Sequence, residues 1–143
     1  MGCDLCVYLP DNGDHDCAMA YSSFNRLRNS IVALYLEKMG KEVELTDGED
    51  FNLMVGVTSM SLVKKVSKAL EEIGTDEAYG LKVFWEHSDC DGDYWSDDCL
   101  SIGHAIKSII DMFDEDDDDK LWAKDLADMF IYAGEHDGIV EVC

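Results

Sequence analysis

Hydrophobic residues in the first half of the chain follow the two-residue period of a strand in some segments and the spacing of a helix in others. Positions 3–9 alternate apolar and polar residues, which predicts a half-buried strand. After a turn-rich stretch at 10–16, apolar residues recur at helical spacing from about 22 to Gly40 and again from about 61 to Gly74. Between these helices, KEVEL at 41–45 is typical of a short strand.

The second half continues the alternation of expected strands and helices. YGLKVFWEH at 79–87 predicts a strand, and a polar loop then leads to Ser96, which we expect to cap a helix with an apolar stripe from Cys99 to Phe113. The acidic run 114–119 separates this helix from another that ends near Gly134, before a last strand at 138–143. The order predicts an α+β fold, in which about four amphipathic helices pack mainly on one face of a small mixed sheet in two layers.

Composition adds a domain count and a strong electrostatic bias. A chain of 143 residues that is 47% hydrophobic suits a single compact domain spanning 1–143. The net charge is −21, which disfavours nucleic acid or an anionic membrane as a direct partner and favours a cationic one. Residues 85–143 hold 18 acidic and 3 basic residues, net −15, against 14 and 8, net −6, in residues 1–84.

The N-terminal segment and the cysteines indicate a compartment. The start MGCDLCVYLP lacks the basic and apolar regions of a signal peptide, and no apolar window is long enough to cross a membrane. We therefore expect a cytoplasmic protein, in which the six cysteines are free thiols.

Four short motifs resemble those of a known family. They are the start MGCD, FNRLR at 24–28, FWEHSDCDG at 84–92 and SDDC at 96–99. A family of small, functionally unassigned proteins of tailed phages and bacteria is similar in its MGxD start, its FNxxR helix and its SDC(D/E)G loop. The resemblance implies a phage or prophage origin, and it supplies no reaction.

The polar loop after the expected strand at 79–87 is the first candidate site. It contains five side chains that suit a divalent cation, and a sixth could join from the next helix: His87, Asp89, Cys90, Asp91, Asp93 and Cys99. Their spacing matches no standard zinc motif, so the alternative is a structural loop in which aspartates accept backbone N–H bonds and the thiols pack inside. A divalent cation (Ca²⁺, Mg²⁺ or Zn²⁺) is the only cofactor that the sequence suggests.

The acidic run between the last two helices is the second candidate. Residues 114–125 resemble an EF-hand calcium loop, with oxygen ligands from Asp114, Asp116, Asp118 and Asp125. Two departures weaken the resemblance: Asp119 replaces the glycine of the sharp turn, and Asp125 replaces the longer glutamate. The alternative is an acidic first helical turn that the helix dipole stabilises.

The first expected helix carries the only two arginines of the chain. From the position of the apolar stripe, Arg26 should point away from the core and Arg28 should lie at its edge. We expect Arg28 to form a structural ion pair with a carboxylate of the 87–93 loop, or else a solvated pair of little energetic value.

Charge ranks the function classes. The leading expectation is an acidic binding protein, a phage accessory or counter-defence factor, that engages a basic surface of a host protein. The alternative is a divalent-cation or small-ligand binding module centred on the 87–93 loop. An enzyme ranks last because the chain has no nucleophile elbow, phosphate-binding glycine loop or recognised metal-hydrolase spacing.

Overall fold

Four antiparallel strands form the single sheet among the described residues. The computed structural model describes residues 2–8, 14–43, 60–86 and 92–142, with side-chain detail for 26–43, 63–86 and 93–141. The strands are β1 (Gly2–Tyr8), β2 (Asp14–Ala20), β3 (Gly92–Tyr94) and β4 (Ile139–Val142), in the order β2-β1-β4-β3. β1 and β4 are the central pair, so the two ends of the described chain meet in the sheet.

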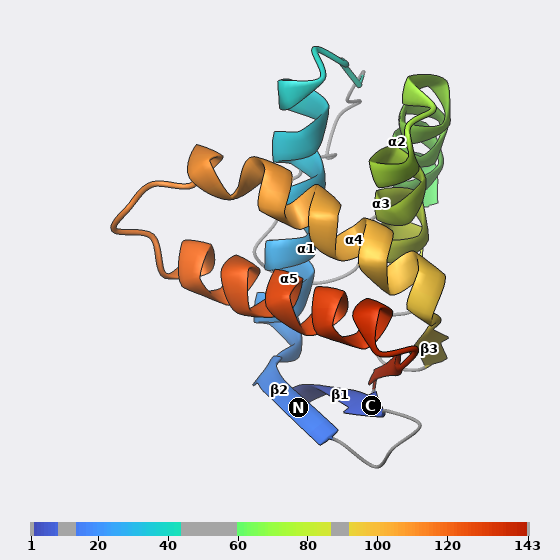
Figure 1. Cartoon of the computed structure of the whole chain (residues 1–143). Helices are drawn as coiled ribbons and strands as arrows, with labels where there is room; N and C mark the ends of the chain where they lie inside the picture. Colours follow the sequence, from blue (N-terminus) through green and yellow to red (C-terminus); the bar gives the residue numbers. More distant parts are fainter. Residues whose placement is uncertain (1, 9–13, 44–59, 87–91, 143) are drawn as a thin grey trace.

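Helices make up most of the molecule. They are α1 (Tyr21–Lys38), α2 (Met60–Ile73), α3 (Asp76–Glu86), α4 (Ser96–Ile109) and α5 (Asp118–Glu135), with a 3₁₀ turn η1 (Ile110–Met112) after α4. α4 and α5 lie side by side and make the most extensive helix contact (Figure 1). The α2–α3 hairpin packs against α4 through α3, and the sheet lies beneath α5 at the lower end of Figure 1.

Three aromatic rings join the helices to the sheet. The ring of Phe130 on α5 meets those of Phe84 on α3 and Tyr94 on β3 edge to face, with centroids 5.8 and 5.2 Å apart. All three residues are fully buried. Because the rings come from three elements, the cluster fixes β3 and the start of α4 against the helical body.

The α+β prediction is confirmed in its class and corrected in its detail. The predicted mixed sheet is wrong, because every strand pair that the structure describes is antiparallel. The described residues form five α-helices where the sequence predicted about four. The helices that end before Gly40 and Gly74 are confirmed, and both glycines have the positive φ of a helix C-terminus, 66° and 74°.

The strand predicted at 79–87 is wrong, because residues 76–86 form helix α3. Thr75 caps this helix by accepting a hydrogen bond from the backbone N–H of Ala78 at 3.1 Å, and acidic residues fill its first turn. The buried residues Leu81, Phe84 and Trp85 follow a helical period. The apolar run is too short for its period to distinguish a helix from a strand.

Three smaller predictions also change. The turn-rich stretch at 10–16 overlaps β2, whose residues the sequence left without a strand. Ser96 is the first residue of α4 and not its cap, which is Trp95 and makes no side-chain capping bond. No strand is present at 41–43, and the rest of the predicted strand at 41–45 lies outside the described residues.

Candidate functional site

Most of the first candidate site lies outside the described residues. His87, Asp89, Cys90 and Asp91 belong to that part, so a cation site centred on them stays a prediction. Asp93 lies on β3, where its cross-strand neighbour is Glu141 of β4.

Cys99 does not have the character of a metal-binding thiolate. It is fully buried at the start of α4, and its Sγ–H donates to the backbone carbonyl of Tyr94 at 3.3 Å. Burial raises the pKa of this thiol to about 12, so it stays protonated at neutral pH. Cys99 is therefore packed as the structural alternative predicts, and its part in a cation site with residues 87–91 stays a prediction, because those residues lie outside the described part of the chain.

The EF-hand interpretation of residues 114–125 is also wrong. Helix α5 begins at Asp118, the fifth position of the expected loop, and includes Asp125. Seven residues of helix place these two residues about 10 Å apart along the axis, so Asp118 and Asp125 cannot converge with Asp114 and Asp116 on one ion. No group of three or more His, Cys, Asp or Glu side chains is placed to hold a metal ion within the described part of the chain.

The alternative for the acidic run is confirmed by the start of α5. The carboxylate of Asp117 caps the helix by accepting from the N–H of Asp119 at 2.9 Å, and Asp118 and Asp119 occupy the first turn. Negative charge at this end is stabilised by the helix dipole. The run therefore builds a helix start, and its remaining carboxylates face solvent.

Arg26 of α1, which the sequence analysis predicted to point into solvent, contacts the acidic run 114–119. Arg26 donates to Asp119 Oδ1 at 2.7 Å, and its side chain is 37% exposed, against 14% for Asp119. Burial raises the pKa of the Asp119 carboxyl above its usual value, Arg26 opposes the rise, and the charges of Asp117 and Asp118 add to it. The ion pair ties the end of the acidic run 114–119 to α1.

Arg28 is buried as expected at the edge of the core. Its guanidinium donates to the backbone carbonyl of Phe84 at 3.4 Å, close to the end of α3. The predicted ion pair with the 87–93 loop concerns residues mostly outside the described part, so it stays a prediction.

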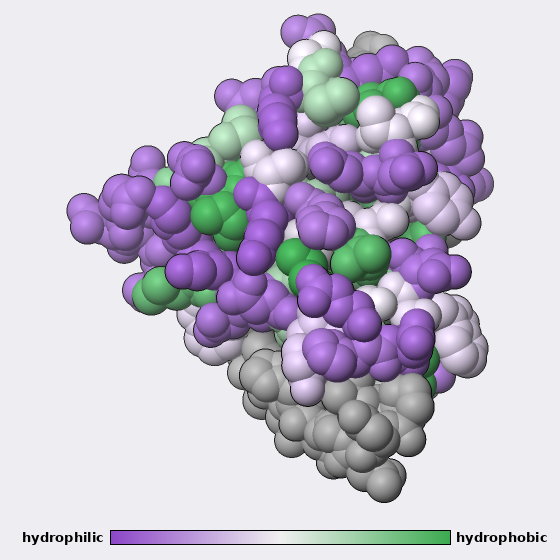
Figure 2. Space-filling model, in the orientation of Figure 1, coloured by the Kyte–Doolittle hydropathy of each residue, from purple (hydrophilic) through white to green (hydrophobic). Residues whose placement is uncertain are grey.

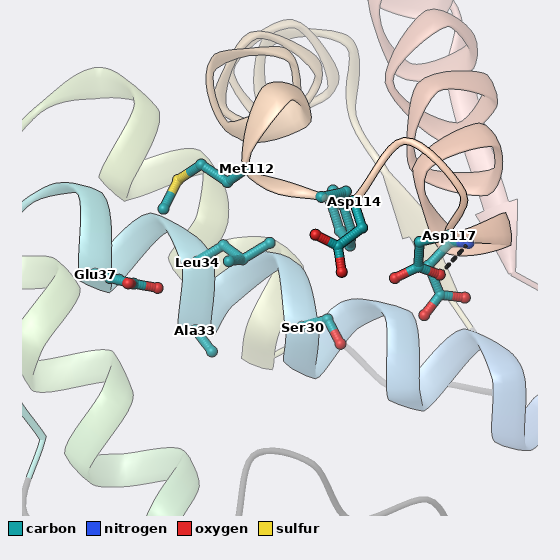
Figure 3. Close-up of a pocket in the computed structure, with 9 residues that line it drawn as sticks. Ser30, Ala33, Leu34, Glu37, Met112, Asp114 and Asp117 are labelled. Atoms are coloured by element: carbon teal, nitrogen blue, oxygen red, sulfur yellow. Dashed lines mark hydrogen bonds between the residues drawn. The ribbon is translucent and has the colours of Figure 1, made fainter.

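A cavity of about 340 Å³ lies between α1 and the connection from η1 to α5. Its lining comes from two segments: Ser30, Ala33, Leu34 and Glu37 of α1, and Met112, Phe113, Asp114, Asp117 and Asp119. Figure 3 shows the carboxylates of Asp114 and Asp117 over α1 near Ser30, and Met112 and Leu34 toward Glu37. The cavity thus combines an apolar wall with carboxylates.

The surface around the cavity is acidic and only partly neutralised. Among residues 111–119, ion pairs with other described residues involve Glu115, with Lys120, and Asp119, with Arg26. Asp111, Asp114 and Asp116 are exposed and form no such pair. Two large hydrophobic side chains adjoin the run, Leu121 at 66% and Trp122 at 40% exposed. Figure 2 shows the face over α4 and α5 as largely hydrophilic, with small separate hydrophobic patches.

Comparisons with protein-family models, with curated proteins and with solved structures find no match to this chain. The resemblance to small phage and bacterial proteins stays a prediction that these comparisons do not test. In the described part of the chain, no helix is both long enough and apolar enough to span a membrane.

Sequence reasoning missed the residues that shape the cavity. Glu37 and Asp117 gave no signal, because a carboxylate at a helix surface and one in an acidic run are both ordinary in sequence. The sequence did indicate that Arg26 could form an ion pair, because a chain with a net charge of −21 has only two arginines. The partner could not be chosen, because residues 114–119 offer six carboxylates in succession.

Proposed function

We propose that this chain is a binding protein whose acidic C-terminal surface engages a basic surface of another protein. The surface is defined here as the exposed face of residues 111–125, with the adjoining cavity against α1. The exposed carboxylates of Asp111, Asp114 and Asp116 carry the proposal. They lie on η1 and on the connection from η1 to α5, and none of them forms an ion pair with a described residue. Such a field speeds association with a cationic protein and requires no catalytic group.

The cavity suits the side chain of a lysine or arginine from the partner. The long apolar stem of such a residue would pack on Leu34 and Met112, while its charged group would meet Asp114 and Asp117. Trp122 would anchor the contact beside the charges, because tryptophan is common among the residues that dominate the energy of protein interfaces. Leu121 would add apolar area next to it. Asp119 is already neutralised by Arg26 and contributes less.

The resemblance to phage and bacterial proteins supports a host protein as this partner, and hence an accessory or counter-defence role. A partner that normally binds nucleic acid has the required basic surface, and carboxylates would compete there with phosphates. The competing explanation for the acidic surface is that its charge only raises solubility. This explanation predicts that no partner binds saturably.

A capture experiment with matched charge variants tests the proposal. The full chain is immobilised on a support and exposed to bacterial lysate. Each captured protein is identified and purified, and its binding to this chain alone is measured. We expect Asp114→Asn/Asp116→Asn to weaken binding at least about tenfold, because each removes an unpaired charge from the surface. The control Glu42→Gln/Glu135→Gln changes the net charge equally, at exposed positions outside the surface, and should change binding little.

Equal loss in both double variants would show that binding follows net charge alone and would overturn the proposal. The absence of any purified partner that binds saturably would have the same consequence.

A further inference from the structure

The cavity between α1 and the connection from η1 to α5 carries carboxylates at both of its ends. Glu37 lies at one end, and Asp114 and Asp117 lie at the other end, near Ser30 (Figure 3). Glu37 follows Ser30 by seven residues on α1, so about 10 Å along the helix axis separates the two ends. The cavity therefore has two negative ends at a defined spacing.

The wall between these ends is apolar. Ala33 and Leu34 of α1 lie between Ser30 and Glu37 in Figure 3, and Met112 of η1 adds to the same wall. The side chain of Leu34 is only partly buried, and Met112 is 37% exposed. Covering this apolar surface with a partner's side chain is favourable, because it removes the surface from water.

No cation of the chain neutralises the two ends. Every lysine and arginine of the chain lies among the residues with described side chains, and none forms an ion pair with Glu37, Asp114 or Asp117. Lys38 directly follows Glu37, but its ammonium group donates to the backbone carbonyl of Ser108 at 3.2 Å. Both ends are therefore complementary to cations from another molecule.

The spacing of the two ends selects the shape of a partner segment. In an α-helix, residues i and i+7 lie on one face about 10 Å apart, and residue i+4 lies between them on that face. In a strand, residues on one face are about 7 or about 13 Å apart, and neither spacing matches the cavity. A helix with basic residues at i and i+7 and an apolar residue at i+4 complements both ends and the wall between them.

We propose that the partner presents such a basic amphipathic helix along α1, an inference that rests on the proposed protein-binding role of the acidic C-terminal surface. One basic residue meets Asp114 and Asp117, and the other meets Glu37. The apolar residue between them packs on Leu34 and Met112, as in other complexes where a helix binds in a groove. No lysine or arginine of this chain has another seven positions after it, so a second copy of the chain does not supply this helix.

Calorimetric titration of the full chain with designed peptides tests the proposal. The probe is an alanine-rich helical peptide of about 20 residues, with lysines at i and i+7 and leucine at i+4. Its isomer has the same composition, but the second lysine moves to i+5, on another face of the helix. Circular dichroism verifies that both peptides are equally helical. We expect the isomer to bind at least about fivefold more weakly, because it loses one ion pair.

Two charge variants of the chain locate the contact. Glu37→Gln should weaken binding of the probe about fivefold. The control Glu135→Gln changes the net charge equally at an exposed position near the other end of α5 and should change binding little. Replacing one of the two probe lysines with glutamine should abolish the effect of Glu37→Gln, whereas replacing the other should preserve it, because each lysine meets a different end of the cavity.

The proposal is overturned if the probe does not bind, if the isomer binds as tightly as the probe, or if Glu37→Gln and Glu135→Gln weaken binding equally. The proposed function still stands after such a result if Asp114→Asn/Asp116→Asn weakens binding of the captured partner. Spermidine, a flexible chain with amines at both ends, is titrated in parallel. Binding of spermidine as tight as that of the probe would overturn the assignment of a helix in favour of a polyamine.

Discussion

Replacing Gly103 with alanine should loosen the α4–α5 pair that supports the acidic surface. Gly103 lies on α4 directly against α5, and a Cβ there would come within 2.5 Å of Ile131 Cγ1. It would also lie 3.0 Å from the carbonyl oxygen of Ala127 and 3.0 Å from the backbone N of Ile131. A side chain can rotate away, whereas the two backbone atoms move only if the helices separate.

Two opposing effects set the size of the change. Alanine is better than glycine inside a helix by about 1 kcal/mol. Forcing an extra carbon into a close-packed contact costs about 1–3 kcal/mol, and backbone contacts on two sides favour the upper part of that range. We expect Gly103→Ala to lower the free energy of unfolding by about 1–2 kcal/mol, which corresponds to a fall of about 3–6 °C in the thermal midpoint.

Thermal unfolding followed by circular dichroism measures this change. His104→Ala, at the exposed neighbouring position of α4, is the control and should alter the midpoint little. Gly103→Ala/Ile131→Ala should cost less than the sum of the single changes, because removing Cγ1 relieves part of the overlap. A midpoint of Gly103→Ala equal to or above that of the wild type would refute the close approach of α4 and α5.

Three further predictions concern the ion pair, the buried thiol and the acidic run. Arg26→Gln should lower the thermal midpoint at pH 7 by about 3 °C, since a partly buried ion pair contributes about 1 kcal/mol. Burial raises the pKa of Asp119, so below about pH 3 its carboxyl is protonated in both the folded and the unfolded chain and forms no ion pair with Arg26. The fall in thermal midpoint caused by Arg26→Gln should therefore disappear below about pH 3. A fall that persists there would contradict the ion pair. Alkylation at pH 8, mapped by mass spectrometry, should leave Cys99 unmodified in the folded protein, whereas rapid labelling would contradict its burial. Millimolar Ca²⁺ and Mg²⁺ should raise the midpoint equally by screening, and a preference for Ca²⁺ that Asp125→Asn removes would restore the EF-hand interpretation.

The long helical periods were predictable because the sequence repeats them over several turns. Both α1 and α2 end before a glycine whose positive φ other residues rarely adopt, and the sequence marks both ends. α3 was mistaken for a strand because its apolar run is short and rich in β-formers such as Val83, Phe84 and Trp85. The Thr75 cap and the two acidic residues after it were the evidence for a helix.

The candidate site was less predictable because it depends on contacts distant in sequence. Arg26 and Asp119 are 93 positions apart, and helical geometry alone placed Arg26 in solvent. The EF-hand interpretation failed on a local feature instead: a strong cap at Asp117 begins α5 before a calcium loop could form. A pattern of ligand types does not specify where the backbone turns into a helix.

The association rate constant with the purified partner, measured as a function of salt, tests whether the acidic C-terminal surface is the binding site. We predict that the rate constant falls steeply between about 50 and about 500 mM salt, while the dissociation rate changes little. We also predict a shallower salt dependence for Asp114→Asn/Asp116→Asn than for Glu42→Gln/Glu135→Gln. An association rate indifferent to salt, or the same slope in both variants, would contradict the claim that the acidic C-terminal surface is the binding site.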